Sequence, residues 1–346
     1  MIRVLVVDDS AYMRELVRAV IEQTPGLQLC GSVNSGAEGV RLAAELSPDV
    51  VLMDLTMPGM DGFEATRRIM GSRRPVPVVV LTARDPGEVS KQVFECGAAE
   101  VVSKDQIGPR LGTVIQTMAG VKVVGLRVRE RPITIAPARK SAPPARPTRK
   151  DAPGELRGVV LVGSSTGGPQ ALQALFGGLE PHPHVAFAVV QHIAAGFMGA
   201  LVEWLSLSTR LTLRIAEHGR RLEPGVVTFA PGDRHLAIER GGLLSLSSAP
   251  ARNGVRPAAD VLFETGAAAY GDRALGLLLT GMGRDGADGL RVLYDAGAHT
   301  LTQSEESCVV YGMPREAVEL GASRGQVTPR EAAVAISAWS ARFRAG

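Results

Sequence analysis

Strand-length apolar runs alternate with segments of helical periodicity along most of this chain, and this alternation constrains the fold more than any other feature. Such a pattern predicts an α/β architecture in which helices cover both faces of a mostly parallel sheet. Residues 1–120 contain five apolar runs, namely Val4–Val7, Gln28–Val33, Val50–Met53, Val76–Leu81 and Glu100–Val102. We therefore expect a parallel sheet with helices on both faces in the first third of the chain.

The alternation stops over residues 121–154. From 123 to 154 the chain holds six prolines and eight Lys/Arg against two acids, which is typical of an extended, semi-rigid linker. A length of 346 residues favours two domains, so we expect them at 1–120 and 155–346. The net charge is +3, and the positive charge of the linker exceeds this value, so the rest of the chain is slightly negative. The expected domains are therefore not basic, which argues against a nucleic-acid-binding surface.

A second α/β pattern follows the linker. Its apolar runs are Val159–Val162, Val185–Gln191, Val226–Ala230 and Ala274–Thr280, and helical segments such as Gln170–Leu179 and Ala287–Ala296 lie between them. Pro231-Gly232-Asp233 separates two β-like runs within Val226–Glu239, so we expect a β-hairpin added to this sheet.

Acidic, hydroxyl and amine side chains follow the expected strands of residues 1–120. In a doubly wound sheet, groups just beyond the carboxyl ends of the strands converge on one crevice. The groups are Asp8 and Asp9 after the first strand, Asp54 after the third, Thr82 after the fourth and Lys104 after the fifth. Clustered carboxylates suit Mg²⁺, and Asp54 could then act as a nucleophile toward a phosphoryl group. Any one of these acids taken alone could equally be a helix cap or a solvated loop residue.

This constellation, with Met57-Pro58-Gly59-Met60-Asp61-Gly62 after Asp54, resembles the receiver domain of bacterial response regulators. The resemblance implies a flavodoxin-like (βα)5 fold and phosphorylation of Asp54 by a histidine kinase. It also implies that Asp8, Asp9, Asp54 and the backbone of Thr56 place Mg²⁺, while Thr82 and Lys104 contact the phosphate. Receivers usually carry an aromatic residue and a proline where this chain has Val101 and Asp105, so an aromatic switch cannot operate through Val101.

A serine turn follows the first strand of the second pattern. Gly163-Ser164-Ser165-Thr166-Gly167 lies between Val159–Val162 and the expected helix, which is the strand–turn–helix context of a nucleophile elbow. The spacing assigns the nucleophile to Ser165. Glycine- and serine-rich turns also cradle phosphates and dinucleotides, so the motif needs partners before it indicates a hydrolase.

The partners follow two further strands. His192 comes directly after Val185–Gln191 and is the candidate base, whereas we expect the other histidines, His182, His184, His218, His235 and His299, in loops or turns as solvated side chains. Asp285 lies in the glycine-rich loop after Ala274–Thr280 and is the candidate acid that orients the base. Asp285 could instead cap the following helix, with Asp288 as the acid.

The order serine, histidine, acid differs from that of α/β-hydrolases, and the turn lacks the GxGxxG spacing of dinucleotide folds. The segments GSSTGG, QHIAAGF, APGDRHL, RPAADVLF and LTGMGRDGADG resemble the catalytic domain of chemotaxis protein-glutamate methylesterases, which usually have Ala at the position of Ser164. The resemblance implies a phosphorylation-activated hydrolase that removes methyl esters from chemoreceptor glutamates, often with deamidation of receptor glutamines, and that needs no cofactor for the esterase step. It implies Ser165, His192 and Asp285 as the catalytic residues, with backbone amides near Thr166 and Met282 stabilising the oxyanion.

The resemblance also implies partners and regulation. The expected partners are methyl-accepting chemoreceptors and a CheA-type histidine kinase, and the unphosphorylated receiver is expected to cover the active site. Arg256 could engage an acidic face of a receptor helix. Three dispersed cysteines and no leader or membrane-spanning pattern favour a cytoplasmic protein without membrane insertion. The competing hypothesis is a response regulator with a non-enzymatic output, which would need a reader motif that the sequence does not show.

Overall fold

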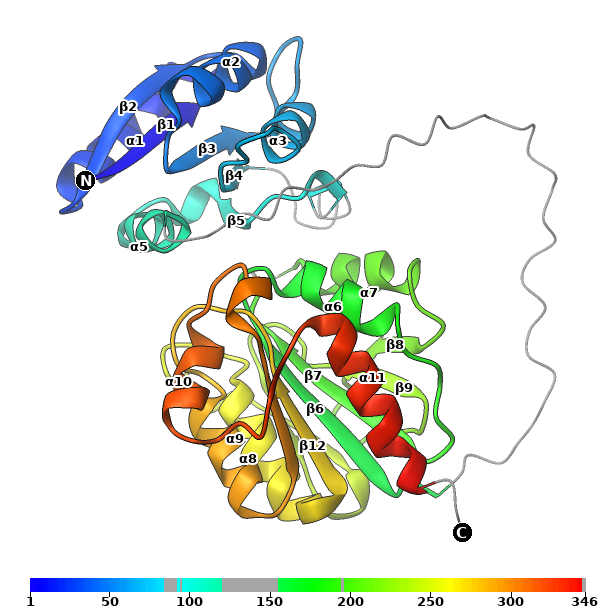
Figure 1. The fold of residues 1–346 in the computed structure, drawn as a ribbon. Helices are drawn as coiled ribbons and strands as arrows, with labels where there is room; N and C mark the ends of the chain where they lie inside the picture. Colours follow the sequence, from blue (N-terminus) through cyan, green and yellow to red (C-terminus); the bar gives the residue numbers. More distant parts are fainter. Residues whose placement is uncertain (84–91, 94, 120–154, 194–195, 344–346) are drawn as a thin grey trace, which may run out of the picture.

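The computed structural model describes residues 1–83, 92–93, 95–119, 155–193 and 196–343, which form two α/β units (Figure 1). The expected linker at 121–154 lies outside the described residues. Within the described residues, no helix is both long and apolar enough to cross a membrane.

The first unit is a five-stranded parallel sheet in the order β2-β1-β3-β4-β5, as the flavodoxin-like expectation requires. Its strands are β1 (Ile2–Val7), β2 (Leu27–Val33), β3 (Val50–Asp54), β4 (Val78–Thr82) and β5 (Glu100–Ser103). Its helices are α1 (Ala11–Gln23), α2 (Gly36–Leu46), α3 (Gly62–Met70) and α5 (Pro109–Met118). Every residue of β3 and β4 is buried because helices cover both faces of the sheet. The carboxyl ends of β1 and β3 thus bring Asp8 and Asp54 to one edge.

The second unit is a seven-stranded parallel sheet in the order β14-β13-β12-β6-β7-β9-β8. Its strands are β6 (Gly158–Ser164), β7 (Val185–Gln191), β8 (Thr212–Ile215), β9 (Val226–Phe229), β12 (Ala274–Leu278), β13 (His299–Gln303) and β14 (Gln326–Val327). The strands β12, β6 and β7 are neighbours, so the loops after them meet at one edge. These are the loops that carry the three candidate catalytic residues.

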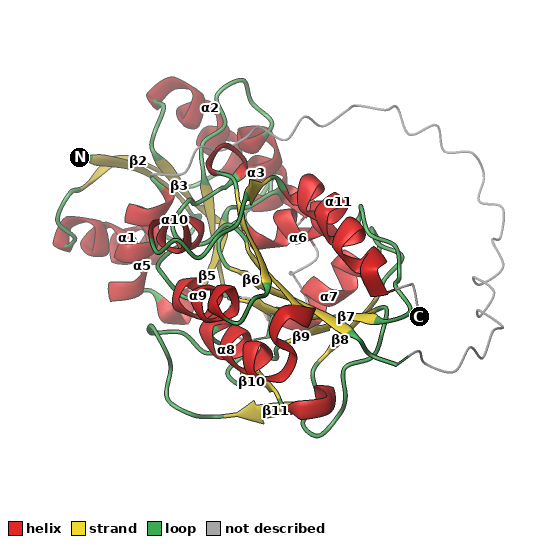
Figure 2. Cartoon of the chain, turned by 60° about the horizontal axis from the view of Figure 1, so that its bottom comes forward, coloured by secondary structure: helices red, strands yellow, loops and turns green. Residues whose placement is uncertain are grey.

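Two groups of helices cover the faces of this sheet (Figure 2). One face packs against α6 (Gly168–Phe176), α7 (Met198–Ser206) and α11 (Pro329–Ser340). The other packs against α8 (Ala259–Tyr270), α9 (Ala287–Asp295) and α10 (Met313–Glu319). The β6 segment alternates its side chains between the two clusters, with Val160 and Val162 on one side and Val159 and Leu161 on the other.

An added hairpin is present, but the sequence analysis assigned it to the wrong segment. The run Val226–Glu239 does not fold back on itself: β9 joins the large sheet in parallel with β7 and β8. The hairpin consists of β10 (His235–Ile238) and β11 (Leu244–Ser247), which pair antiparallel outside the large sheet. The turn at Pro231-Gly232-Asp233 therefore redirects the chain between two sheets.

The two units touch along β5 and α5 of the first and the loops after β6, β7 and β12 of the second (Figure 1). Phe197, which is 1% exposed, packs in an apolar cluster with residues of the first unit that include Leu55, Phe63 and Val80. Glu100 Oε2 accepts a hydrogen bond from Thr166 Oγ1 at 3.0 Å. The interface therefore lies directly over the serine turn.

Candidate active site and phosphoacceptor site

Ser165 lies in a tight turn between β6 and α6. Its amide donates to Thr280 O at 3.0 Å, and the Gly168 amide donates to Ser165 O at 2.8 Å. Gly167 has φ +76°, a left-handed conformation that favours glycine. At Gly281, a Cβ would lie 2.7 Å from Ser165 Cβ, so only glycine lets this loop approach the serine so closely. The glycines thus allow the turn after β6 and the loop at Gly281 to pack closely around the candidate nucleophile.

His192 and Asp285 form a hydrogen-bonded pair beside this turn. His192 Nε2 lies 2.9 Å from Asp285 Oδ2, and the two side chains are only 13% and 4% exposed. Since the carboxylate occupies Nε2, Nδ1 is the nitrogen left to serve the serine. Ser165 and His192 line the same two cavities, one of them with a volume of about 670 Å³. The structure therefore brings the three predicted residues together at one sheet edge.

Asp285 is surrounded by donors. Its Oδ2 also accepts from the Ala259 amide at 2.6 Å, and its Oδ1 accepts from the Asp260 amide at 3.3 Å. Burial alone would raise the pKa of Asp285, but the hydrogen bond and charge of His192 and these two amides outweigh it, so the pKa is lowered. Asp285 is therefore held as a carboxylate, the form that orients an imidazole and stabilises its cation. The alternative acid, Asp288, is instead paired with Arg284 at the surface.

Two residues that the sequence analysis did not select hold this arrangement in place. Gln191 is 2% exposed, and its Nε2 donates to Ser165 O at 2.8 Å and to His192 O at 2.7 Å. Thr280, fully buried, donates from Oγ1 to Thr166 O at 3.0 Å and accepts from the Val310 amide at 2.8 Å. In the sequence each of them is a polar residue at the end of an otherwise apolar run, a pattern that also occurs wherever a strand simply ends.

The amides of Thr166 and Met282 lie in the two loops that flank Ser165. Among the residues that the structure describes, no backbone or side-chain acceptor is hydrogen-bonded to either amide. The neighbouring amides are used differently, since Ser165 N donates to Thr280 O and Gly281 N to Val310 O. Two unused donors beside the serine are what an oxyanion site requires.

The expectation of solvated histidines is wrong for three of them. His182 is buried, with 6% of its surface exposed, and its Nδ1 accepts from the His184 amide at 3.2 Å. His235 lies in β10 and is 2% exposed; its Nε2 hydrogen-bonds with Pro250 O at 3.1 Å, and its Nδ1 accepts from the Ala258 amide at 3.2 Å. His299 lies in β13 and is partly buried. His235 therefore fixes the segment that leads into α8, a structural role that an isolated histidine in a polar stretch did not reveal.

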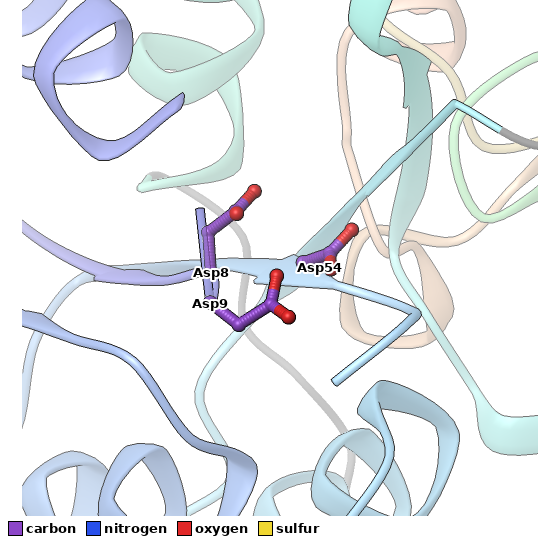
Figure 3. Close-up of side chains that lie close together, drawn as sticks. All are labelled: Asp8, Asp9 and Asp54. Carbon is purple, nitrogen blue, oxygen red and sulfur yellow. The ribbon is translucent and has the colours of Figure 1, made fainter. Parts of the chain in front are cut away.

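The carboxylates Asp8, Asp9 and Asp54 gather at the edge of the first sheet (Figure 3). Each offers an oxygen, and these oxygens lie within 4.8 Å of one another. Lys104 Nζ contacts Asp8 Oδ2 at 2.7 Å and Asp54 Oδ1 at 2.8 Å, and the Thr56 amide donates to Asp54 Oδ2 at 3.2 Å. Thr82 is buried at the end of the neighbouring strand β4. All the predicted residues of this site thus lie around one edge.

Asp54 ionises less readily at this edge than it would in water, because its pKa is raised. Burial raises the pKa of Asp54, and the charges of Asp8 and Asp9 add to this effect, whereas Lys104 opposes it. Burial would lower the pKa of Lys104, but its hydrogen bonds with Asp54 and Asp8 outweigh this, so the pKa is raised. Three carboxylates facing one ammonium leave negative charge uncompensated, which is a donor set that suits a hard divalent cation.

Both units of the chain match known protein families. Residues 4–116 match the family model described as response regulator receiver domain, and residues 160–336 match the one described as CheB methylesterase. A protein-glutamate methylesterase/protein-glutamine glutaminase of Anaeromyxobacter dehalogenans is 42% identical over 93% of this chain and 92% of its own length. One from Geobacter metallireducens is 38% identical over 97% and 98%. The chain belongs to this methylesterase family.

A solved structure supports the fold of the methylesterase unit. The solved CheB methylesterase catalytic domain of Thermotoga maritima is 33% identical to this chain. The match covers 52% of this chain and 96% of the Thermotoga chain, with a TM-score of 0.50.

Ser164, the residue before the candidate nucleophile, contacts Gln191. Its Oγ donates to Gln191 Oε1 at 2.7 Å. The hydroxyl at Ser164 therefore orients the amide that bridges Ser165 and His192.

The receiver unit of this methylesterase family member contacts its catalytic unit without an aromatic residue at position 101. Val101 is partly buried and packs against the cluster that holds Phe197, while Asp105 is exposed. The cavity of about 670 Å³ is lined by Glu100, Thr113 and Thr117 from the receiver and by Ser165 and His192 from the catalytic unit. Receiver side chains thus form one wall of the space in front of the serine.

Proposed function

We propose that this chain is a phosphorylation-activated serine hydrolase that demethylates glutamate γ-methyl esters on chemoreceptors and releases methanol. The observation that carries the proposal is the convergence of Ser165, His192 and Asp285 at one sheet edge, with His192 held 2.9 Å from Asp285. Membership of a family whose members are named protein-glutamate methylesterases supports the substrate class.

In the proposed mechanism Ser165 Oγ attacks the ester carbonyl while His192 removes its proton. The amides of Thr166 and Met282 stabilise the oxyanion, and Asp285 stabilises the imidazolium. When the carbon–methoxy bond breaks, His192 returns the proton and methanol leaves. Water, deprotonated by His192, then attacks the acyl-serine, the bond between the carbonyl carbon and Ser165 Oγ breaks, and His192 returns the proton to Oγ as the glutamate leaves. These steps use only groups of the chain and no cofactor.

We extend the proposal to deamidation of receptor glutamines, the second activity in the names of the relatives. A side-chain amide presents the same carbonyl to Ser165, and His192 would protonate the leaving ammonia. An amide is the poorer electrophile, so we expect this reaction to be slower at the same site.

We propose that the receiver switches this activity. Asp54 would accept a phosphoryl group from a CheA-type histidine kinase, and Thr82 and Lys104 would contact the phosphate oxygens. Asp8, Asp9, Asp54 and the backbone of Thr56 would hold Mg²⁺, which neutralises the carboxylates and the phosphoryl group when bound. The uncompensated charge of the cluster supports this donor set.

Before phosphorylation, the receiver would restrict access to Ser165. The contact between Glu100 and Thr166 supports this, because Thr166 directly follows the nucleophile and Glu100 lies on the strand before Lys104. Residues 155–346 alone should therefore hydrolyse methylated receptor faster than the full chain. An equal or lower rate in a folded fragment would contradict the proposal that the receiver restricts access to Ser165.

Arg256 is a candidate contact for an acidic receptor helix. It is exposed, it lines the cavity in front of Ser165, and its Nη1 donates to Ser248 O and Ala249 O at 3.1 and 3.0 Å. We expect Arg256→Ala to raise KM for methylated receptor several-fold with little change in kcat. An unchanged kcat/KM would remove this residue from substrate binding.

We propose that the chain acts in the cytoplasm, where kinase and receptor signalling regions would be accessible. The three cysteines Cys30, Cys96 and Cys308 are free, which is typical of a reducing compartment.

The decisive experiment measures methanol release from methylated receptor membranes by wild-type and Ser165→Ala protein. Ser165→Ala should lower the rate at least about 10³-fold, since it removes the nucleophile. Ser206→Ala, at an exposed hydroxyl on α7, is the matched control and should retain the wild-type rate. Equal release by wild type and Ser165→Ala would refute the hydrolase.

A further inference from the structure

The N-terminal ends of α8 and α9 exchange carboxylates. Asp285, in the loop before α9, accepts from the Ala259 and Asp260 amides in the first turn of α8. In return, Asp260 Oδ1 accepts from the Gly289 amide in the first turn of α9 at 2.7 Å. Neither helix has a side-chain cap on its own N-cap residue, Ala258 or Gly286. Each helix is therefore capped by an acid that belongs to the other.

The two helices approach too closely for this exchange to be incidental. A Cβ at Gly289 would lie 2.8 Å from Asp260 Cα and 2.8 Å from Phe263 Cβ. Because glycine permits the contact, the Gly289 amide can reach the Asp260 carboxylate directly. The Asp260 side chain is fully buried, so its two oxygens depend on protein donors for hydrogen bonds.

The second oxygen of Asp260 reaches the wall of the cavity in front of the serine. Asn253 Nδ2 donates to Asp260 Oδ2 at 2.7 Å, and Asn253 lines the same cavity as Ser165 and His192. Arg252 Nε lies 3.7 Å from the same Asp260 oxygen, and a bidentate ion pair with Glu264 at 2.6 Å holds Arg252 in place. One buried carboxylate thus joins α8, α9 and the loop that borders the candidate substrate cavity.

Keeping this acid buried next to Asp285 is electrostatically unfavourable. Burial raises the pKa of Asp260 to about 6, and the charge of Asp285 contributes to the increase, while the Gly289 amide and the charge of Arg252 oppose it. A neutral polar side chain could cap α9 without this repulsion. A carboxylate, in contrast, can accept from the Gly289 amide and the Asn253 side chain at once without presenting a donor to either.

We propose that Asp260 is a positioning residue for the hydrolytic reaction, which fixes the α8 amides and the α9 loop on either side of Asp285 and thereby aims His192 at Ser165. The inference rests on the proposed function, since it assigns Asp260 to the same site. Asp260 itself touches neither the nucleophile nor the base, so it acts through Asp285.

Three variants remove the contacts of Asp260 in steps. Asn253→Gly deletes only the Asn253 donor, and glycine suits the φ of +51° at this position. Asp260→Asn retains an acceptor for Gly289 but places its amide group against the Asn253 donor. Asp260→Ala removes both hydrogen bonds and also the ion pair with Arg252. Asp295→Asn, at an exposed ion-paired acid on the same helix α9, is the matched control.

The test uses the full chain and two readouts, methanol release from methylated receptor and the rate at which a fluorophosphonate labels Ser165. We expect kcat to fall about 10- to 100-fold in Asp260→Ala, with KM within about twofold, because misaiming a catalytic group affects the reacting geometry. Asn253→Gly should have the smallest effect and Asp260→Asn an intermediate one, while Asp295→Asn should match wild type. Labelling rates, corrected for the folded fraction by circular dichroism, should follow the same order.

A double-mutant cycle separates positioning from general structural support. If Asp260 acts through Asp285, then adding Asp260→Asn to Asp285→Asn should lower the labelling rate less than about twofold further. Full additivity, or a loss explained by the unfolded fraction alone, would overturn the inference. Absence of Ser165 labelling in wild type would instead refute the proposed function, whereas normal labelling of wild type and Asp260→Ala alike would refute only the role of Asp260.

Discussion

The receiver and the catalytic unit each place carboxylates at the carboxyl edge of a parallel sheet, but the two surroundings act on ionisation in opposite directions. At Asp54, burial and the neighbouring acids raise the pKa, and Lys104 compensates for only part of this. At Asp285, a histidine and two backbone amides outweigh burial and lower the pKa. Both acids follow strands at the carboxyl edge of a sheet. The charge of Asp54 is only partly compensated, whereas Asp285 has enough hydrogen-bond donors to stay ionised.

This difference matches what each site would do. Asp285 has its hydrogen-bond partners within the chain, so its geometry is set before any ligand arrives, as orientation of a catalytic base requires. The receiver cluster has more negative than positive charge. Binding of a divalent cation or transfer of a phosphoryl group would therefore change its net charge and its hydrogen bonds. The receiver site can respond to a signal because part of its charge is uncompensated, whereas the catalytic site needs its hydrogen-bond partners in place beforehand.

The largest effect should follow from removing the charge of Asp285. We expect Asp285→Asn to lower kcat for methanol release about 10³- to 10⁴-fold, because an amide cannot stabilise the imidazolium and favours the wrong tautomer. Steady-state assays on methylated receptor measure this loss. Asp288→Asn, at the exposed acid paired with Arg284, is the control and should change kcat less than twofold. A similar loss in both would return Asp288 to consideration as the catalytic acid.

Loss of the bridge between nucleophile and base should have the next largest effect. Gln191→Ala removes the two donors that fix the carbonyls of Ser165 and His192, and we expect kcat to fall about 10²-fold. Gln191→Glu is informative because it keeps the shape but replaces the donating nitrogen with oxygen. Wild-type kcat in Gln191→Ala would show that the catalytic site does not depend on this amide.

Asp54→Asn should abolish activation by a small phosphodonor such as acetyl phosphate with Mg²⁺, which we expect to be about tenfold in wild type. The same phosphodonor should still activate Asp105→Asn, whose side chain is exposed beyond the cluster. Methanol release with and without phosphodonor measures the effect. Undiminished activation of Asp54→Asn would remove Asp54 as the phosphoacceptor.

The opposite pKa shifts predict opposite changes in stability. Because the folded-state pKa of Asp54 is raised, the stability of the protein falls as the pH rises from the unfolded-state pKa of about 4 through the folded-state pKa. Asp54→Asn, which carries no charge, should therefore stabilise the protein at pH 7 without metal. A lowered pKa means that Asp285 contributes stability above its unfolded pKa of about 4, and that this contribution is lost as pH falls further. Asp285→Asn should therefore destabilise at pH 7, by less as the pH approaches 3.

Urea unfolding of wild type and both variants, followed by circular dichroism from about pH 3 to pH 8, measures these changes. Added Mg²⁺ should reverse the sign for Asp54→Asn, since wild type would bind the cation more tightly. Destabilisation by both substitutions in metal-free buffer would contradict the comparison.

The smallest expected effect concerns Ser164. Ser164→Ala removes only the hydroxyl that orients Gln191, whose other two hydrogen bonds remain, so kcat should fall about twofold. A loss of tenfold or more would mean that Gln191 is far less constrained by the backbone than its contacts indicate.

Much of the fold and of the candidate site could be predicted because most strands are apolar runs in the sequence, and most of these runs are followed by a candidate site residue. The run Val185–Gln191 coincides with β7, and His192 follows it as expected. The strand β13 escaped prediction because its sequence, His-Thr-Leu-Thr-Gln, is mostly polar. Its polar groups find partners inside the fold, as when Gln303 Oε1 accepts from the Thr280 amide at 2.8 Å.

The supporting residues could not be predicted for a related reason. Gln191, Asp260 and His235 act by contacting segments that are distant in the sequence, and no local pattern specifies such contacts. The hairpin was misplaced because a turn signal such as Pro231-Gly232-Asp233 reveals that the chain changes direction but not which strand it will join.

One feature of the receiver also limits how the protein could be re-engineered. The strand β5 carries Glu100, which contacts the catalytic unit, and leads directly to Lys104, which contacts the phosphoacceptor. Since successive strand residues face opposite sides of a sheet, inserting one residue between them would turn one of these side chains away from its partner. Insertions of two residues would restore the facing but lengthen the separation by about 7 Å. We expect natural and designed length variants to spare this strand, and a domain graft to need β5 and Lys104 as one piece.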